Sequence, residues 1–526
     1  MADPTGPSGP TRPTGSGRRG PRPLRRSVQR PAERSRRTDP PRLAAYTVMR
    51  AVSDGAYANL ELPGVLRDKG IHGRDAAFST ELVYGATRMH GLYDAVVAVA
   101  AGRDLAAIDV NVLDTLRLGV HQLLGMRVPT HAAVDETVAL ARQVNGAGAA
   151  GFVNAVMRRV SERTREEWVD LVAPDTLEPM ARRAVRSSHP EWVVRALRAA
   201  LVGHGASTAA TVDADLDALL DSDNAPARVT LVARPGLADP AELVAAGGER
   251  GRLARTAVVL REGDPGGIRA VRDGRAAVQD EGSQLVALAL AAVQLEPLAA
   301  GAAGAAGRGW AAGSGGAGGL GERWLDLCAG PGGKDGLLAG LALQQGASLV
   351  ANEVSPHRAD LVRHTLAAAM RAPGGDRVEV RIGDGRELGT EEPGGYDKVL
   401  VDAPCTGLGA LRRRPEARWR RVPGDVTALA SLQRQLLASA LDATRVGGVV
   451  AYATCSPHLN ETLFVVRDLL KHRDDVELID ARPLVTRPDG SPVPDLGEGP
   501  TVQLWPHLHG TDGMFLALLR RTSRAD

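Results

Sequence analysis

The chain has 526 residues and a formal net charge of +2; 44% of its residues are hydrophobic and three are cysteines. A single hydrophobic core stops growing at roughly 250 to 300 residues, so this length predicts two or more domains. Three cysteines without a C-x-x-C pair exclude a disulfide framework and argue against a metal site. No apolar run reaches roughly 18 residues and no secretory signal is visible, which predicts a cytoplasmic protein without a membrane partner.

The first segment, residues 1–40, is basic and rich in Pro, Gly and Ser. It contains ten Arg, two Asp and one Glu, which gives a local charge of +7. Because such a composition cannot bury a core, we expect a disordered arm. Its charge favours a phosphate-bearing partner, and a solvated tail without function is an equally weighted alternative.

Three further segments precede the most informative part of the chain. Residues 41–165 carry apolar residues at three- and four-residue spacing, as in NVLDTLRLGVHQLL, and predict a bundle of amphipathic helices. Residues 166–296 combine helical runs such as SQLVALALAAVQ with strand-like runs, RVTLVA and RAAVQD, and indicate linker helices with a small α+β subdomain. Residues 297–322 are low-complexity Gly and Ala and predict a flexible insertion.

Residues 323–522 show an alternation of strands and helices. Five short β-rich runs are separated by segments long enough for crossover helices: RWLDLCA, SLVANEV, VEVRIGD, YDKVLVDAP and GGVVAYATC. This rhythm predicts a parallel, doubly wound α/β sheet. The final runs VQLWP and GMFLALLRR predict a C-terminal hairpin with no helix between its strands. Ligands of such sheets bind at the carboxyl ends of the strands.

A Gly-rich turn, DLCAGPGGKDG at residues 326–336, follows the first strand and opens a helix. Glycines let backbone N–H groups approach a ligand beside the positive end of the helix dipole. A phosphate-binding P-loop is excluded because Cys328 and Asp335 stand where that motif needs Gly and Ser or Thr. The dinucleotide pattern also fails at Asp335. The turn therefore predicts a site for an adenosine-type ligand that need not carry a triphosphate.

Acidic residues stand at the ends of the next three strands. Glu353 ends the second strand and is suited to accept hydrogen bonds from ribose hydroxyls, as in dinucleotide-binding folds. Asp384 follows the third strand and could accept from an adenine amino group. Asp402 leaves the fourth strand. A single carboxylate at a strand end is common, but the recurrence at successive ends indicates a binding site.

A basic segment at residues 410–421, ALRRRPEARWRR, follows the fourth strand. Arginines with an interleaved aromatic ring are suited to phosphate contact and base stacking. The segment therefore predicts a surface for phosphate contact and base stacking, and a merely solvated basic face is the alternative. The residues expected to form this surface, which the family resemblance below implies to be an RNA-binding one, are Arg412, Arg413, Arg414, Arg418 and Trp419.

Two cysteines, Cys405 and Cys455, lie just beyond neighbouring strands in turns that begin Cys-Thr and Cys-Ser. A structural cysteine is usually buried within an element. Two thiols at the ligand edge of the sheet instead fit covalent catalysis on a pyrimidine, in which a thiolate adds to C6 and C5 then attacks an electrophilic carbon. From the residues alone, either cysteine can be the nucleophile.

Taken together, these motifs resemble the RNA (cytosine-C5)-methyltransferase family. The likeness covers about residues 275–522, includes VQDEGSQ, and is carried by DLCAGPGGK, DAPCTGLG and ATCSPHLNE in this order. The helical front, with RDAAFSTELVYGATR and GFVNAVMRRV, is similar to the antitermination factor NusB. The combination resembles the Sun or RsmB branch, which methylates a cytosine of 16S ribosomal RNA. The resemblance implies a class I, Rossmann-like methyltransferase domain with S-adenosyl-L-methionine as cofactor.

The resemblance also implies roles for individual residues. Cys455 is implied to be the nucleophile and Cys405 to assist product release, whereas DNA cytosine methyltransferases use the Pro-Cys position as the nucleophile. Asp402 is implied to lie between the methionine moiety and the cytosine and to recognise the base. Glu353 is implied to hold the cofactor's ribose, and Asp384 its adenine. The implied cofactor loop comprises Cys328, Ala329, Gly330, Pro331, Gly332, Gly333 and Lys334.

We therefore expect a monomeric enzyme that methylates C5 of a cytosine in RNA, with 16S rRNA as the favoured substrate. Two alternatives stay open. One keeps the chemistry but changes the substrate to tRNA or large-subunit rRNA. The other is a NusB-like RNA-binding or transcription-regulating module with a vestigial methyltransferase half, against which the intact loop, acids and cysteines argue.

Overall fold

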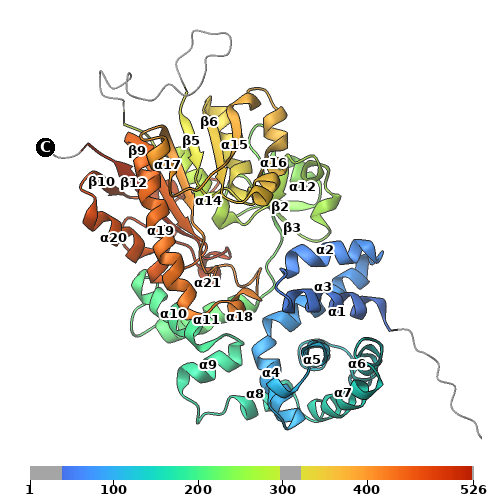
Figure 1. Ribbon diagram of the computed structural model, residues 1–526. Helices are drawn as coiled ribbons and strands as arrows, with labels where there is room; N and C mark the ends of the chain where they lie inside the picture. Colours follow the sequence, from blue (N-terminus) through green and yellow to red (C-terminus); the bar gives the residue numbers. More distant parts are fainter. Residues whose placement is uncertain (1–37, 297–320, 524–526) are drawn as a thin grey trace, which may run out of the picture. The chain divides into compact units, whose positions relative to one another are not determined.

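The computed structural model describes residues 38–296 and 321–523 (Figure 1). The basic arm up to residue 37 and the Gly/Ala insertion at residues 297–320 lie outside the described residues, so the expectations for them stay predictions. Within the described ranges, no helix has both the length and the apolar character that a bilayer crossing requires.

The N-terminal region is a helical bundle, as its apolar spacing predicts. Its first helix begins at Pro40, one residue before the predicted boundary, because the fixed φ of proline suits the first turn of a helix. Two apolar clusters hold the bundle together, one around Val48 and Leu82 and one around Tyr93 and Leu116. The helices are α1 (Pro40–Ser53), α2 (Ala58–Asp68), α3 (Gly73–Arg88), α4 (His90–Ala101), α5 (Val110–Leu124), α6 (Thr130–Val144), α7 (Ala147–Val160) and α8 (Arg165–Val172).

A second region contains linker helices and a four-stranded antiparallel sheet in the order β2-β3-β1-β4. The strands predicted at RVTLVA and RAAVQD are confirmed as β1 and β4. The sequence does not predict β2 and β3, since these strands have only three and four residues and form by pairing, β2 with β3 and β3 also with β1. The elements are α9 (Pro179–Ser187), α10 (Glu191–Gly203), α11 (Val212–Asn224), β1 (Thr230–Ala233), α12 (Pro240–Ala245), β2 (Gly248–Arg250), β3 (Ala257–Leu260), α13 (Arg269–Arg272) and β4 (Ala276–Val278).

The third region is built on a mixed sheet with the strand order β10-β12-β9-β8-β5-β6-β7. The five predicted strands are confirmed as its parallel part, and β12 and β10 extend it through antiparallel pairing. The sequence interpretation does not include β10, whose four residues are only partly buried or exposed. The strands are β5 (Arg323–Asp326), β6 (Ser348–Glu353), β7 (Val378–Ile382), β8 (Tyr396–Asp402), β9 (Thr444–Thr454), β10 (Val476–Ile479) and β12 (Phe515–Arg521).

Helices cover both faces of this sheet, which confirms the doubly wound arrangement (Figure 1). Helices α14 (Glu281–Ala292), α15 (Gly333–Gln345) and α16 (Pro356–Arg371) share an apolar cluster with one face. Helices α17 (Leu388–Glu391), α19 (Pro423–Ala443) and α20 (Leu463–His472) pack against the other. Because the parallel strands all point the same way, their carboxyl ends meet at one edge of the sheet.

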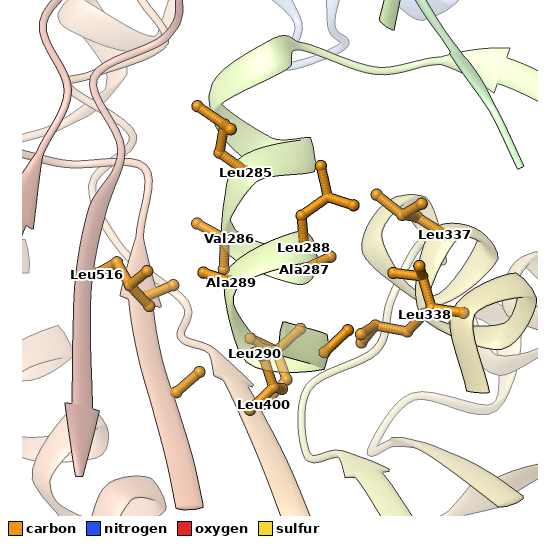
Figure 2. Packing of buried hydrophobic residues seen from close by; sticks show 14 of the residues in the cluster. Leu285, Val286, Ala287, Leu288, Ala289, Leu290, Leu337, Leu338, Leu400 and Leu516 are labelled. Carbon is orange, nitrogen blue, oxygen red and sulfur yellow. The ribbon is translucent and has the colours of Figure 1, made fainter. Parts of the chain in front are cut away.

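Helix α14 belongs to the core of the large sheet. Figure 2 shows it beside α15 and the strands, and its Val286 and Leu288 share one buried cluster with Leu338, Leu400 and Leu516. A helix that is apolar on every side needs partners all round it. The sequence pattern assigns this helix to the subdomain at residues 166–296, whereas its packing makes it part of the following α/β unit.

The C-terminal pairing differs from the prediction in one respect. Strand β11 (Val502–Gln503) pairs antiparallel with β12, with Val502 opposite Leu516, so the hairpin itself is confirmed. The expectation that no helix fits between the strands is wrong, because α21 (Pro506–His509) lies there. Proline at the first helical position and the left-handed Gly510, with φ 71°, allow this single turn to begin and end within the short connection.

Candidate active site

The loop after β5 passes very close to two neighbouring segments. A Cβ on Gly330 would lie 2.2 Å from Oε2 of Glu353. Gly332 has φ 100°, and a Cβ there would lie 2.9 Å from Thr365. Only glycine satisfies both the space and the backbone conformation at such a position. The course of the loop therefore requires glycine at position 332, and Gly330 leaves room for the Glu353 carboxylate, whereas Gly333 has open space around it.

Carboxylates at the ends of neighbouring strands surround this loop. Glu353, at the end of β6, is buried, and its Oε2 accepts a hydrogen bond from the Gly330 N–H at 3.0 Å. The guanidinium of Arg358 lies 3.5 Å from the same oxygen. Asp384, after β7, accepts from the backbone N–H of Arg386 at 3.0 Å. Since β6 and β7 are parallel neighbours, the two acids lie at the same sheet edge.

Asp326, the last residue of β5, supplies a third carboxyl group directly before the loop. It is 1% exposed and accepts a hydrogen bond from the Cys328 N–H at 3.0 Å. Burial, reinforced by the negative charge of Asp402, raises its pKa to about 7. The Asp326 carboxyl therefore keeps its proton to higher pH than an exposed aspartate does.

An ion pair connects the loop to the fourth strand. Lys334, in the first turn of α15, lies 2.7 Å from Oδ2 of Asp402 at the end of β8. Burial lowers the pKa of the Lys334 ammonium, but the carboxylate of Asp402 outweighs this effect and the pKa is raised. Lys334 consequently remains a cation, directed at the strand end that the sequence predicts to meet the base.

The two cysteines predicted to be catalytic are brought into contact. The sulfur atoms of Cys405 and Cys455 lie 3.4 Å apart, at the ends of the neighbouring parallel strands β8 and β9. This separation is far longer than the roughly 2.05 Å of a disulfide bond, so both are free thiols. The strand order thus joins two residues that are 50 positions apart in the sequence.

Comparison with known proteins shows to which family this chain belongs. Residues 319–520 match the model "16S rRNA methyltransferase RsmB/F", and residues 39–162 match the NusB family. A Mycobacterium tuberculosis protein named "Putative methyltransferase Rv1407" is 50% identical over 491 residues, which cover 93% of this chain and 98% of the relative. The chain belongs to the RsmB/F family of methyltransferases.

More distant relatives agree with this assignment. The "Ribosomal RNA small subunit methyltransferase B" of Pseudomonas putida is 31% identical over 82% of this chain and 88% of its own length. The crystal structure of PH0851 has a TM-score of 0.72 and 20% identity, covers 92% of this chain and 99% of its own, and shows the shared fold. RsmB/F proteins are S-adenosylmethionine-dependent RNA methyltransferases, and the N-terminal bundle is the RNA-binding NusB domain.

The two thiols of this RsmB/F protein have unlike electrostatic surroundings. The hydrogen bond between them lowers the pKa of Cys455 and outweighs the effect of its burial, and Lys334 acts in the same direction. The same hydrogen bond raises the pKa of Cys405 well above its ordinary value, and burial adds to the rise. These directions favour Cys455 as the thiolate of the pair and Cys405 as the S–H donor.

This asymmetry predicts the order in which the cysteines react. At neutral pH, iodoacetamide is expected to alkylate Cys455 faster than Cys405 or Cys328, because a lower pKa leaves a larger fraction of thiolate and burial raises the pKa of Cys328. Peptide mass spectrometry across neutral and alkaline pH measures each rate. In the variant Lys334→Met, the alkylation of Cys455 should begin at higher pH, since the stabilising ammonium is lost. Earlier modification of Cys405 would contradict the asymmetry.

The basic segment after Cys405 is largely internal, contrary to the sequence prediction. Arg412 is buried, and its guanidinium lies 2.9 Å from Asp280 and 3.1 Å from Asp512. Arg413 joins the same two carboxylates, at 2.9 Å from Asp512. This four-residue cluster, which we call the arginine–aspartate cluster, links the segment to the start of α14 and to the loop before β12. These arginines neutralise buried acids, so they do not form an exposed basic surface.

Arg418 is also buried, with no exposed surface. Its guanidinium donates to the Asn224 side chain at 2.8 Å and to the backbone carbonyls of Ser188 and Arg88 at 3.1 and 3.5 Å. Burial lowers its pKa to about 10. The prediction that Arg418 lies on a surface open to RNA is therefore wrong, because this residue connects the catalytic unit with the linker helices and the NusB domain.

Trp419 and Arg414 complete the segment. Trp419 is half-buried, with its ring 5.3 Å from that of His90 in the NusB domain. Arg414 is exposed, and its guanidinium lies 5.4 Å from the centre of the Tyr57 ring. Of the five residues predicted to bind RNA, Arg414 alone is classed as exposed in the structure.

Sequence reasoning missed several residues that hold the site together. Asp280 lies in VQDEGSQ, which the sequence identifies only as part of a family resemblance. Glu461 lies in ATCSPHLNE, which likewise enters only as part of that resemblance. His204 is buried, and its Nε2 lies 3.0 Å from the carbonyl of Pro457 in the turn after Cys455. No local signal marks His204, because its partner is 253 residues away.

Proposed function

We propose that the protein methylates C5 of a cytosine in 16S rRNA through a covalent bond between Cys455 and C6 of the base. The observation that carries the proposal is the contact between two thiols with opposite pKa shifts. A single reactive cysteine suffices for many enzymes, whereas addition to a pyrimidine and later elimination benefit from two groups with separate roles. The Lys334–Asp402 ion pair supports the proposal, because it links the Gly-rich loop to the end of β8, shortly before Cys405.

The residues around the loop fit S-adenosylmethionine, which supplies an electrophilic methyl group on a sulfonium. The strand-end carboxylates Glu353 and Asp384 retain lone pairs that can accept from ribose hydroxyls and an adenine amino group. The close approach at Gly330 and Gly332 leaves backbone rather than side chains facing that edge. Residues 328–334 would surround the methionine moiety, which carries the reacting carbon.

Cys455 begins the reaction with its thiolate, which adds to C6 and makes C5 a nucleophile. C5 accepts the methyl group, a base removes the C5 proton, and the C6–S bond breaks to return the thiolate. Cys405 lies 3.4 Å from that sulfur and retains its proton at neutral pH, so it can donate a hydrogen bond to the departing thiolate. The contact that lowers the pKa of Cys455 thus also favours its release.

Asp402 is suited to recognise the base. A carboxylate accepts a hydrogen bond from the exocyclic amino group of cytosine, and uracil has no donor at that position. The ammonium of Lys334, 2.7 Å away, holds the carboxylate in place at the end of β8. The target base must leave any stack to reach this buried edge, as in other enzymes that modify a base.

The proposal of 16S rRNA draws on the names of the family model and of relatives such as the Pseudomonas putida protein. A NusB domain and exposed Arg414 are compatible with an RNA substrate. Transfer RNA and large-subunit rRNA are the alternatives that keep the same chemistry. A regulatory RNA-binding protein with a vestigial catalytic half is disfavoured by the intact thiol pair, ion pair and strand-end acids.

One experiment separates these substrates. RNA from a strain that lacks the gene is incubated with the purified protein and S-adenosylmethionine, and 5-methylcytosine is then mapped by bisulfite sequencing. We expect one cytosine of 16S rRNA to become 5-methylcytosine after this incubation. The same position should be unmethylated in RNA of the deletion strain that was not incubated with the protein. Methylation confined to tRNA or 23S rRNA would identify that RNA as the substrate in place of 16S rRNA. If neither naked RNA nor ribosomal subunits were methylated, the enzymatic proposal would be overturned.

A further inference from the structure

Glu461 is a buried carboxylate that contacts the turns of both cysteines. It ends a short 3-10 helix, Leu459–Glu461, and has no exposed surface. Its Oε1 accepts from the backbone N–H of Thr406 at 2.8 Å, and its Oε2 accepts from the Ser456 hydroxyl at 2.7 Å. Thr406 follows Cys405 and Ser456 follows Cys455 in the chain. A single side chain therefore joins the two turns that present the thiols.

Further hydrogen bonds make this junction rigid. The Thr406 hydroxyl also donates to Oε2 of Glu461 at 2.5 Å, and the amide of Gln433 donates to Oε1 at 3.3 Å. Tyr452, within β9, donates its hydroxyl proton to the Glu461 carbonyl at 2.7 Å. Four donors on one carboxylate compensate the loss of water that burial imposes. The network connects α19, β9 and both cysteine turns.

The charge of Glu461 acts on the two thiols unequally. It is among the influences that raise the pKa of Cys405, after the hydrogen bond to Cys455 and burial. The ammonium of Lys334 acts on Cys455 and lowers its pKa. The buried carboxylate of Glu461 thus favours the protonated form of Cys405, the thiol that must keep its proton. The surrounding charges thus distinguish Cys405 from Cys455.

We propose that Glu461 is a positioning residue for RNA methylation: by tying the Thr406 and Ser456 turns together, it holds Cys405 against Cys455 so that the methylated base can be released. This inference rests on the proposed roles of the two cysteines. Displacement of a catalytic group by about 1 Å can lower a rate by about 100-fold. Loss of the junction should therefore impair release more than the first addition, since Cys455 keeps Lys334 as its electrostatic partner.

The test compares Glu461→Ala with Glu461→Gln in the full-length protein. The glutamine can still accept from the Thr406 N–H and donate to the two hydroxyls, so it keeps the junction but lacks the charge. With 16S rRNA from the deletion strain, we expect Glu461→Ala to lower kcat by about 100-fold and to lower KM for RNA with it, because release then limits turnover. A covalent protein–RNA adduct should accumulate on denaturing gels, and Glu461→Gln should restore most of kcat. Asn460→Ala, at the exposed neighbouring position, is the matched control.

A second variant keeps the test decisive if Glu461→Ala does not fold. Thr406→Val removes the hydroxyl donor but keeps the backbone one, and should give a smaller loss of kcat with the same adduct. Normal turnover of either folded variant, or a loss of kcat without adduct, would overturn the inference. If Cys455→Ala remains active, the proposed function itself fails. If Cys455→Ala is inactive while Glu461→Ala turns over normally, only the role of Glu461 is refuted.

Discussion

Replacement of Cys455 with alanine is expected to lower the rate of RNA methylation by at least about 10³-fold, because no other thiolate is available at the base. Cys405 lies 3.4 Å away, but its raised pKa keeps it protonated and unreactive at neutral pH. The measurement is transfer of a tritiated methyl group to 16S rRNA. Binding of S-adenosylmethionine, followed by calorimetry, should be retained, since the loop at residues 328–334 is unchanged.

The matched variant is Cys455→Ser, which keeps the size of the side chain and removes the acidic thiol. It should be as inactive as Cys455→Ala, because a serine hydroxyl stays protonated at neutral pH. Turnover within about tenfold of the unmodified protein in either variant would refute the assignment of the nucleophile. Loss of both methylation and cofactor binding would indicate a folding defect, which thermal unfolding distinguishes.

Replacement of Cys405 with alanine is expected to trap the protein on its substrate. Cys455 still adds to C6, but the hydrogen bond that favours its departure is gone, so turnover should fall by roughly 100-fold. A species with the combined mass of protein and RNA should persist on denaturing gels in the presence of S-adenosylmethionine. The pKa of Cys455 should rise in this variant, because the Cys405 hydrogen bond is the largest influence that lowers it.

The double variant Cys405→Ala/Cys455→Ala provides the control. It should form no adduct, since the trapped species requires the Cys455 sulfur. If Cys455→Ala alone yields an adduct and Cys405→Ala does not, the two roles are reversed. That outcome would assign to this protein the order used by DNA cytosine methyltransferases, with the Pro-Cys cysteine as nucleophile.

The parallel part of the large sheet was predictable because each strand is a short, continuous apolar run between helical segments. The unit to which α14 belongs was harder to assign, since a helix that is apolar on every side does not reveal which sheet it covers. Strands β2 and β10 escaped prediction for a related reason: they are short edge strands, formed by pairing with neighbours and not by a local pattern.

The basic segment at residues 410–421 shows the limit of reasoning from residue type. Arginine is usually exposed, so a run of arginines beside a tryptophan predicts a nucleic-acid surface. In the structure, Arg412 and Arg413 neutralise Asp280 and Asp512, and Arg418 donates to groups in the linker and the NusB domain. Those partners lie between 99 and 330 residues away in the sequence, where no local pattern identifies them.

The sequence by itself determined the class of fold, the Gly-rich loop, the strand-end acids and the presence of both cysteines at one edge. Parallel strands joined by crossover helices bring their carboxyl ends together, so residues that follow strands must become neighbours. Only the tertiary structure brought the two sulfur atoms into contact and decided which arginines are internal. These properties depend on distances of a few ångströms between distant segments, as at Lys334, Asp402 and Glu461, and on burial that folding alone creates.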